Sequence, residues 1–404
     1  MVLGRLASAT RALGKKAISE PRSGVGVIAD VFGRALGAVD QLGTKFYADG
    51  LNCSESGWGE LETVDALTRR MLHPPADVWT SGELDVEVTW NDGEWEVVYG
   101  GQDAEDTVYA AGFSFASPGW SPELAAAVPM LAASERAMAR VVTDDPGAFL
   151  AGKQAVLVGA PPSGIEGFSR PTTAVGIPLA HKHGVATVMI EAPMYGRRRA
   201  AHRKTGNAAR FEGAADLMAQ AAVIAHEQRA MLEWLRNDIG ASNLVVGGLS
   251  YGGLMSSIVA TTLPYETGLV VGFAPVSPER VFADPATVMG RTVDYAKLGA
   301  DDGTDAETAR AKLAAYLRED ASLAVRPLPI ATQVPGRIEA LSAVHDGFVL
   351  PDMSIALHEH LMLPESAITW CVGGHASSFI LHTREFCRAV ARVAAAHVPP
   401  STRL

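Results

Sequence analysis

The stretch Gly248–Gly252, which reads Gly-Leu-Ser-Tyr-Gly, contains the residue best suited to nucleophilic chemistry, Ser250. The run Asn243–Val246 before it is typical of a buried strand, and Leu254–Val259 after it begins a helical pattern. A serine on a tight turn between a strand and a helix has an exposed hydroxyl, and flanking glycines leave room for that turn. An ordinary serine in a glycine-rich turn is the alternative, but this context favours a nucleophile.

A serine hydroxyl attacks a carbonyl carbon readily only when a base accepts its proton, and histidine often has that role. His375 directly follows the last apolar strand run of the chain, which is where the base is expected after a serine and an acid. His345 and His358 precede that strand, and His382 lies inside a helical pattern. The sequence therefore predicts that His375 is the base.

The acid that orients the histidine should follow the preceding strand. The run Ile338–Val344 leads directly into His345 and Asp346, so Asp346 stands at the carboxyl end of that predicted strand. Asp352, further along the same segment, is the alternative. Position favours Asp346.

Two backbone N–H groups are expected to stabilise the oxyanion that forms on attack. One should belong to Tyr251, the residue after the nucleophile, and the other to the loop Gly159–Gly164 after an earlier strand. Pro161 and Pro162 in that loop have no N–H group. Ala160 is therefore the best candidate for the second donor.

A basic segment, Glu191–Arg199, follows another predicted strand at the same edge of the sheet. Tyr195, Arg197 and Arg198 in this segment are candidates to hold a carboxylate or phosphate group of a substrate. An ion-paired loop or a solvated basic run explains the same residues equally well, and both interpretations stay open.

Short apolar runs alternate with helical patterns, the longest of which is Ala214–Asn237. Buried strands that alternate with helices indicate a mostly parallel sheet with helices on both faces. The predicted strands are Ala155–Val158, Ala186–Ile190, Leu244–Val246, Leu269–Phe273, Ile338–Ala343 and Ala367–Val372.

The preceding segment predicts an antiparallel edge. The runs Val86–Trp90 and Glu94–Tyr99 alternate around Asn91–Gly93, which is a hairpin signal. Thr107–Ala116 reads as a further strand, and the alanine-rich stretch Leu124–Val142 as a helix.

The domain organisation follows from these patterns. We expect a helical N-terminal extension over residues 1–80 and a core in two parts, residues 81–274 and 336–404. Residues 275–335 separate two predicted strands by a long gap that holds the acidic, helical pattern Asp301–Asp320. Because a structureless loop of that length is unusual, we interpret it as a small helical lid.

The segment Met1–Ser19 is basic, with a rough apolar stripe at helical spacing. It is consistent with a transit peptide, with an interfacial helix that contacts a membrane peripherally, or with an exposed helix that docks on the protein itself. A secretory signal is not expected, because no continuous apolar region is present.

Composition narrows the function classes. The formal net charge of −11 disfavours a nucleic-acid binder, and no stretch is long and apolar enough to span a bilayer. Cys53, Cys371 and Cys387 have neither zinc nor disulfide spacing, which favours a reducing, cytoplasmic compartment.

The chain resembles the family of α/β-hydrolase-domain-containing protein 18 in four stretches that occur in the family order. They are Gly112–Pro118 (GFSFASP), Ile190–Arg198 (IEAPMYGRR), Gly248–Gly253 (GLSYGG) and Gly373–Ser378 (GGHASS). The resemblance implies an α/β-hydrolase fold, the triad Ser250, Asp346 and His375, and an acyl-lipid or other ester substrate near a membrane. Residues 1 to about 100 match poorly, and the loop Gly159–Gly164 has two prolines where the family has a glycine-containing turn.

These observations predict a serine hydrolase that cleaves a carboxylic ester of a small molecule or lipid through an acyl-enzyme. Neither a metal nor an organic cofactor is expected. A peptidase or amidase with the same triad is one alternative, since both reactions use the same nucleophile. A catalytically inactive fold that serves as a binding module is another.

Overall fold

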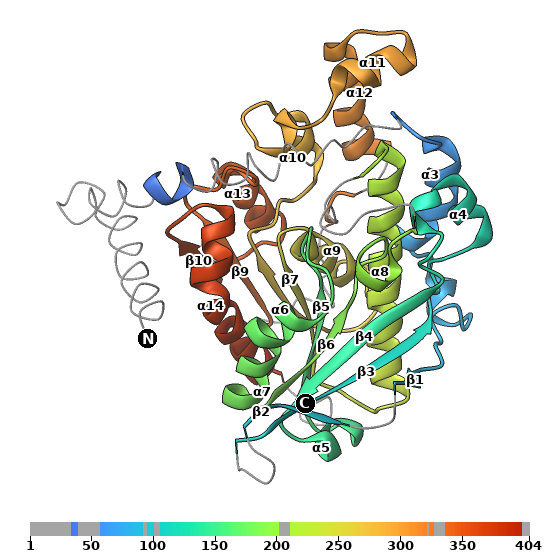
Figure 1. Ribbon diagram of the computed structural model, residues 1–404. Coiled ribbons are helices and arrows are strands. Elements are labelled where there is room, and N and C mark those ends of the chain that lie inside the picture. Colours follow the sequence, from blue (N-terminus) through green and yellow to red (C-terminus); the bar gives the residue numbers. More distant parts are fainter. Residues whose placement is uncertain are drawn as a thin grey trace, which may run out of the picture.

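The computed structural model describes residues 34–38, 57–91, 95–100, 106–201, 211–320, 323–326 and 336–397. Its centre is a ten-stranded sheet in the order β1-β3-β4-β6-β5-β7-β8-β9-β10, with β2 also paired to β3 (Figure 1). Adjacent strands from β6 through β5 and on to β10 are parallel. The pairs β3–β4 and β4–β6 are antiparallel. This is the arrangement of an α/β-hydrolase fold: a mostly parallel sheet with an antiparallel edge.

The six predicted strands of the parallel part are confirmed. They are β5 (Ala155–Ala160), β6 (Val185–Ile190), β7 (Leu244–Leu249), β8 (Gly268–Gly272), β9 (Ile338–Ala343) and β10 (Ile368–Cys371). Every residue of β6, β7 and β8 is buried. Because both faces of these strands are covered, the sequence shows continuous apolar runs there instead of alternation.

The predicted hairpin at the edge is wrong. β1 (Thr89–Trp90) and β2 (Glu96–Tyr99) both pair with β3 (Val108–Ala116), with Thr89 opposite Ser114 and Glu96 opposite Ala110. They therefore run in the same direction along one edge of β3, as two pieces of an interrupted strand. Residues 92 and 93 of the proposed turn lie outside the described part of the chain. Both runs pair with β3, which comes later in the chain. Local turn signals do not reveal that pairing.

The predicted helix Leu124–Val142 is also wrong. Only α4 (Pro122–Ala127) is α-helical there, and β4 (Arg136–Thr143) is a strand between β3 and β6. Pro129 begins a 3-10 turn directly after α4, so the helix does not continue. Buried residues alternate with less buried ones from Arg136 to Arg140, which is the period of a strand. The high alanine content of the stretch favoured a helix and made the alternation hard to recognise.

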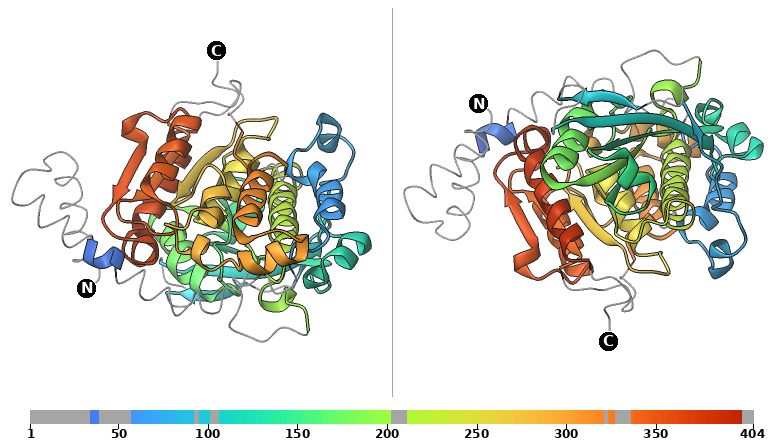
Figure 2. Two further views of the ribbon diagram at one scale, coloured as in Figure 1. Left: turned by 90° about the horizontal axis from the view of Figure 1, so that it is seen from above. Right: turned by 90° about the horizontal axis from the view of Figure 1, so that it is seen from below.

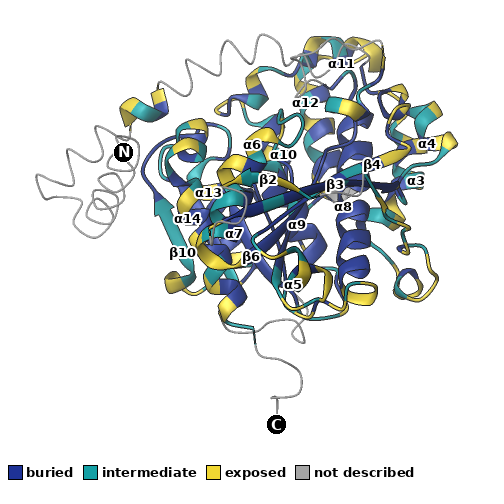
Figure 3. Ribbon diagram, turned by 60° about the horizontal axis from the view of Figure 1, so that its bottom comes forward, coloured by how far each residue is buried: buried dark blue, intermediate teal, exposed yellow. Residues whose placement is uncertain are grey.

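Helices cover both faces of the sheet (Figures 1 and 2). α8 (Ala214–Asn237) and α9 (Tyr251–Ala260) pack on one face, and α7 (Ile177–His183) and α14 (His375–Ala395) on the other. Apart from its ends, α8 is buried all round, because α3 (Leu61–Leu72) packs against its outer side (Figure 3). The Arg229 side chain on α8 joins the two helices by donating to the backbone carbonyls of Met71 and Leu72.

Residues 275–320 form helices at the end of the molecule where the parallel strands finish (Figure 1). They include α10 (Glu279–Ala283), α11 (Tyr295–Asp302) and α12 (Ala306–Ala315), so the helical pattern was correct, although Gly303 breaks it in two at a φ of 67°. The Val288 N–H donates to Gly347 O at 2.9 Å, which ties this segment to the loop after β9. Opening as a lid, and the domain limits at 80, 274 and 335, stay predictions.

The basic segment Met1–Ser19 and Cys53 lie outside the described residues. Within the predicted N-terminal extension, the described helices are residues 34–38, α3 and a 3-10 turn at Ala76–Trp79. No helix of the described chain has the length and apolar character needed to cross a membrane.

Candidate active site

Ser250 sits on the turn between β7 and α9, as predicted. Its φ of 54° and ψ of −122° lie outside the regions that L residues usually adopt, so the turn holds it under backbone strain. The Ser250 N–H donates to Gly272 O at 2.7 Å, and Ser250 O accepts from the Leu254 N–H at 3.0 Å. These bonds fix the strained backbone from both sides and leave the hydroxyl half-buried at the start of a helix.

The two glycines of the motif are required by close packing. A Cβ on Gly252 would lie 2.2 Å from Ala160 O, and a Cβ on Gly248 would lie 2.5 Å from the Gly252 carbonyl carbon. Any side chain at either position would therefore displace the backbone that carries Ser250.

Asp346 and His375 meet Ser250 although they come from separate strands. His375 Nε2 lies 2.8 Å from Ser250 Oγ, and His375 Nδ1 lies 2.6 Å from Asp346 Oδ2. Asp346 is 4% exposed, and its Oδ1 accepts from the Phe348 and Val349 N–H groups at 2.8 and 2.9 Å. These bonds hold the carboxylate in one orientation towards the His375 ring, as the partner of a histidine should be held.

The backbone beyond β9 and β10 keeps the acid and the histidine in register. The Val344 N–H donates to Cys371 O, and the His345 N–H donates to Gly373 O. These bonds extend the pairing of the two segments beyond the ends of β9 and β10. Asp346 directly follows His345, and His375 stands two residues after Gly373. The sheet therefore sets their separation.

Aromatic side chains surround the His375 ring. Ring centroids of Phe348, Phe379 and Phe273 lie 4.9, 5.3 and 6.4 Å from it. Apolar neighbours on these sides restrict the imidazole to the orientation that its two hydrogen bonds define.

The alternative residues are engaged elsewhere. Asp352 is exposed and pairs with Arg280 at 2.6 Å. His358 is buried against Ser342 Oγ at 2.9 Å, and burial lowers its pKa to about 4. His382 is buried on α14, where its Nε2 lies 3.2 Å from Val372 O. These three side chains therefore bond groups outside the Ser250–His375–Asp346 series.

The two predicted oxyanion donors lie on either side of the nucleophile turn. Tyr251 is the first residue of α9, and Ala160 is the last residue of β5, opposite Gly248. The Tyr251 phenol lies 3.5 Å from Leu217 O on α8, and burial raises its pKa well above the usual value. The backbone N–H of Tyr251 stays the candidate oxyanion donor.

The basic segment after β6 divides into residues with different surroundings. Arg197 is exposed, and Tyr195 is 2% exposed. Arg198 is 1% exposed and forms an ion pair with Glu227 on α8. Its terminal nitrogens also donate to Glu191 O at 2.7 Å and Ser134 O at 3.1 Å. These contacts favour the ion-paired alternative for Arg198 over contact with a substrate, because both of its terminal nitrogens are already bonded inside the protein.

Glu227 and Glu191 are polar residues that the sequence reasoning missed. Glu227 accepts from Ser117 Oγ at 2.5 Å as well as from Arg198, so it joins two of the matched stretches. Glu191 accepts from the Gly167 N–H at 3.0 Å and the Arg197 N–H at 3.3 Å, and burial raises its pKa. For both residues, the signal available in the sequence was an acidic residue in or beside an otherwise apolar run.

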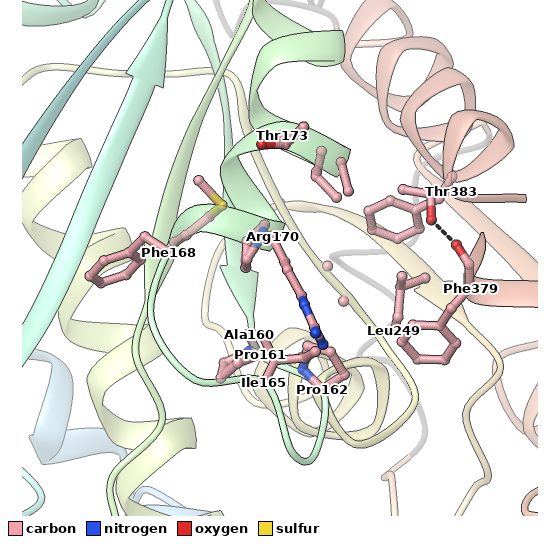
Figure 4. A pocket seen from close by; sticks show the side chains of 18 of the residues that line it. Ala160, Pro161, Pro162, Ile165, Phe168, Arg170, Thr173, Leu249, Phe379 and Thr383 are labelled. Atoms are coloured by element: carbon pink, nitrogen blue, oxygen red, sulfur yellow. Dashed lines mark hydrogen bonds between the residues drawn. The ribbon is translucent and has the colours of Figure 1, made fainter. Parts of the chain in front are cut away.

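A cavity of about 810 Å³ lies next to the nucleophile turn. Figure 4 shows side chains that line it. Ala160, Leu249 and Phe379 form part of its wall, next to the nucleophile turn and the His375 ring. Among the described residues, no cluster of histidine, cysteine and acidic side chains could hold a metal ion.

Comparison with known proteins gives a family and several distant structures. The family model described as "Alpha/beta hydrolase domain containing 18" matches residues 53–333 and 299–394. No curated relative matches the chain.

The solved structures resemble the chain at low identity. Acetyl xylan esterase 1 from a Thermoanaerobacterium species is 14% identical, with a TM-score of 0.47 over 81% of this chain and 97% of that one. An acetyl xylan esterase from a Paenibacillus species is 16% identical, with a TM-score of 0.47 over 78% and 98%. Prolyl oligopeptidase B from Galerina marginata is 11% identical, with a TM-score of 0.41 over 77% and 37%.

Proposed function

The chain belongs to the alpha/beta hydrolase domain containing 18 family, and we propose that it is a serine hydrolase that cleaves carboxylic esters. The observation that carries this proposal is the continuous hydrogen-bonded series from Ser250 Oγ through His375 to Asp346, with distances of 2.8 and 2.6 Å. A nucleophile, a base and an orienting acid in such contact are suited to acyl transfer.

In the proposed reaction, Ser250 Oγ attacks the ester carbonyl carbon while His375 Nε2 accepts the hydroxyl proton. Asp346 accepts the Nδ1–H hydrogen bond and stabilises the imidazolium. The N–H groups of Tyr251 and Ala160 stabilise the oxyanion, each worth about 3 kcal/mol. His375 then gives its proton to the leaving alcohol.

Water next attacks the acyl-enzyme, with His375 again accepting a proton, and the carboxylic acid is released as Ser250 is restored. Tyr195 and Arg197 stay candidates for contact with the substrate. An acyl lipid is the substrate suggested by the resemblance, and the basic segment Met1–Ser19 is proposed to contact a membrane peripherally.

Labelling with a fluorophosphonate probe tests the proposal, together with turnover of p-nitrophenyl esters of short and long acyl chains and of matched amides. We expect the wild type to label and to hydrolyse esters, and Ser250→Ala to lose both, with turnover reduced by roughly 10⁶-fold. Ser257→Ala is the matched control, since this hydroxyl lies on the same helix and donates to Gly253 O at 2.8 Å.

Preferential turnover of the amides would favour a peptidase or amidase over an esterase. A folded wild type that neither labels nor turns over any substrate would contradict the enzyme and favour a binding module.

A further inference from the structure

The cavity beside the nucleophile turn, here called the α6–α14 pocket, has mostly apolar walls. It lies between α6 (Ser169–Pro171) with the turns that follow it and the first turns of α14, over strands β5, β6 and β7. Apolar side chains from all these elements line it, among them Leu157, Val175, Met189, Leu249, Phe379 and Phe386. Its volume of about 810 Å³ lies within the range of ligand pockets.

The triad does not line this pocket. Ser250, Asp346 and His375 are absent from its walls, whereas Leu249 and Phe379 are present. Leu249 directly precedes Ser250, and the Phe379 ring packs on His375. A ligand here would therefore contact residues that support the triad, and it would also lie against Ala160, the candidate oxyanion donor that lines the pocket.

Two arginines give the pocket a positive character. Arg170 on α6 and Arg384 on α14 are both exposed and both line it, and the Arg170 side chain runs across it in Figure 4. In the described part of the chain, neither guanidinium is paired with a carboxylate, unlike the neighbouring Arg388, which pairs with Glu385 at 3.1 Å. The acid that lines the pocket, Glu191, is bonded to backbone N–H groups.

We propose that the α6–α14 pocket binds a free long-chain carboxylate, with its alkyl chain between the apolar walls and its anionic group at Arg170 and Arg384. Burial of each methylene group and charge attraction at the arginines both favour this ligand. The proposal does not depend on esterase activity.

Charge argues against the basic N-terminal segment of this chain as the occupant of the pocket. The segment Met1–Ser19 contains Arg5, Arg11, Lys15 and Lys16 and no acidic residue. Two arginines at the pocket would repel it. A carboxylate has the complementary charge.

Calorimetric titration of the full-length protein with saturated carboxylates, from hexanoate to palmitate and below their micelle concentrations, tests the proposal directly. Each added methylene should tighten binding about fourfold until the pocket is filled, from about 0.8 kcal/mol per buried methylene. The alcohols of equal chain length should bind about tenfold more weakly.

Three variants locate the site. Arg170→Ala combined with Arg384→Ala should weaken carboxylate binding about tenfold and leave alcohol binding unchanged. Arg388→Ala, which removes an arginine one turn further along α14 and outside the pocket, should leave both unchanged. Val175→Trp should block both ligands by filling the pocket, and Thr173→Trp at the exposed rim serves if Val175→Trp does not fold.

Absence of binding in the wild type would overturn the proposal. Binding that resists both tryptophan variants, or that Arg388→Ala weakens as much as the paired alanine variant does, would also overturn it, since the carboxylates would then adsorb elsewhere. Because no arm measures turnover, an inactive triad would leave these outcomes unchanged.

Discussion

The Ser250 turn follows β7 and the Arg198 segment follows β6, two parallel strands with β5 between them, yet their polar groups are used differently. Ser250 Oγ is half-buried and lies 2.8 Å from His375 Nε2, the proposed base. Arg198 is 1% exposed, and its terminal nitrogens bond Glu227 and backbone carbonyls. A polar residue after a parallel strand is therefore only a candidate. Its exposure and its remaining bonding capacity decide whether it can meet a substrate.

The comparison separates two kinds of effect. Changes at the triad should alter the rate of the proposed reaction and leave the free energy of unfolding nearly unchanged. Changes at Arg198 and its partners should do the reverse, because those contacts lie inside the protein. The following predictions run from the largest expected effect to the smallest.

Asp346→Asn should lower kcat by about 10⁴-fold, because an amide that donates to His375 favours the wrong tautomer for accepting the serine proton. Steady-state turnover of a p-nitrophenyl ester measures this. The melting temperature should change little, since the two backbone bonds to Oδ1 can be kept by the amide oxygen.

Asp352→Asn is the matched control, because this aspartate is exposed and bonds only Arg280. Its kcat should stay within about twofold of the wild type. Loss of turnover in Asp352→Asn with normal turnover in Asp346→Asn would reverse the assignment of the acid.

Arg198→Met should lower the free energy of unfolding by about 3–5 kcal/mol, because it leaves Glu227 buried without its cationic partner. Urea denaturation measures the loss. Combining Arg198→Met with Glu227→Leu should recover part of it, since the uncompensated charge is then removed.

Arg199→Met is the control for the same segment, because its ion pair with Glu166 at 2.8 Å is partly exposed. Such a pair contributes about 1 kcal/mol or less. A stability loss for Arg199→Met as large as that for Arg198→Met would contradict the contrast between buried and exposed arginines.

Acidification should weaken the fold through His358. Burial lowers its pKa to about 4 from the usual 6.5, so the folded protein favours the neutral ring and the unfolded chain takes up the proton first. The stability that this ring contributes is present above pH 6.5 and is lost as the pH falls towards 4. The total loss is about 3 kcal/mol.

His358→Gln removes this titration, and urea denaturation at several pH values measures the difference. The acid-induced loss between pH 6.5 and 4 should be smaller in the variant by about 3 kcal/mol. An identical pH dependence in the two proteins would show that His358 does not titrate there.

The central part of the fold was predictable because its signals are local. Buried runs with helical patterns between them located β5 to β10 and α8, since a strand covered on both faces must be apolar throughout. The edge was not predictable in the same way. β1 and β2 both pair with β3, which comes later in the chain. The formation of β4 as a strand depends on pairing with β3 and β6 more than on its alanine content.

The sequence by itself determined the residue types that the chemistry needs and the strands after which they stand, because glycine spacing and apolar runs are local features of the sequence. Only the tertiary structure decided which of them meet. It brought Asp346 and His375 to Ser250 across the sheet, and it turned Arg198 inward to Glu227 on α8. It also left a cavity between α6 and α14, a space bounded by residues from seven elements that no single stretch of sequence describes. Contacts between distant segments are set by packing, and packing depends on the whole folded chain.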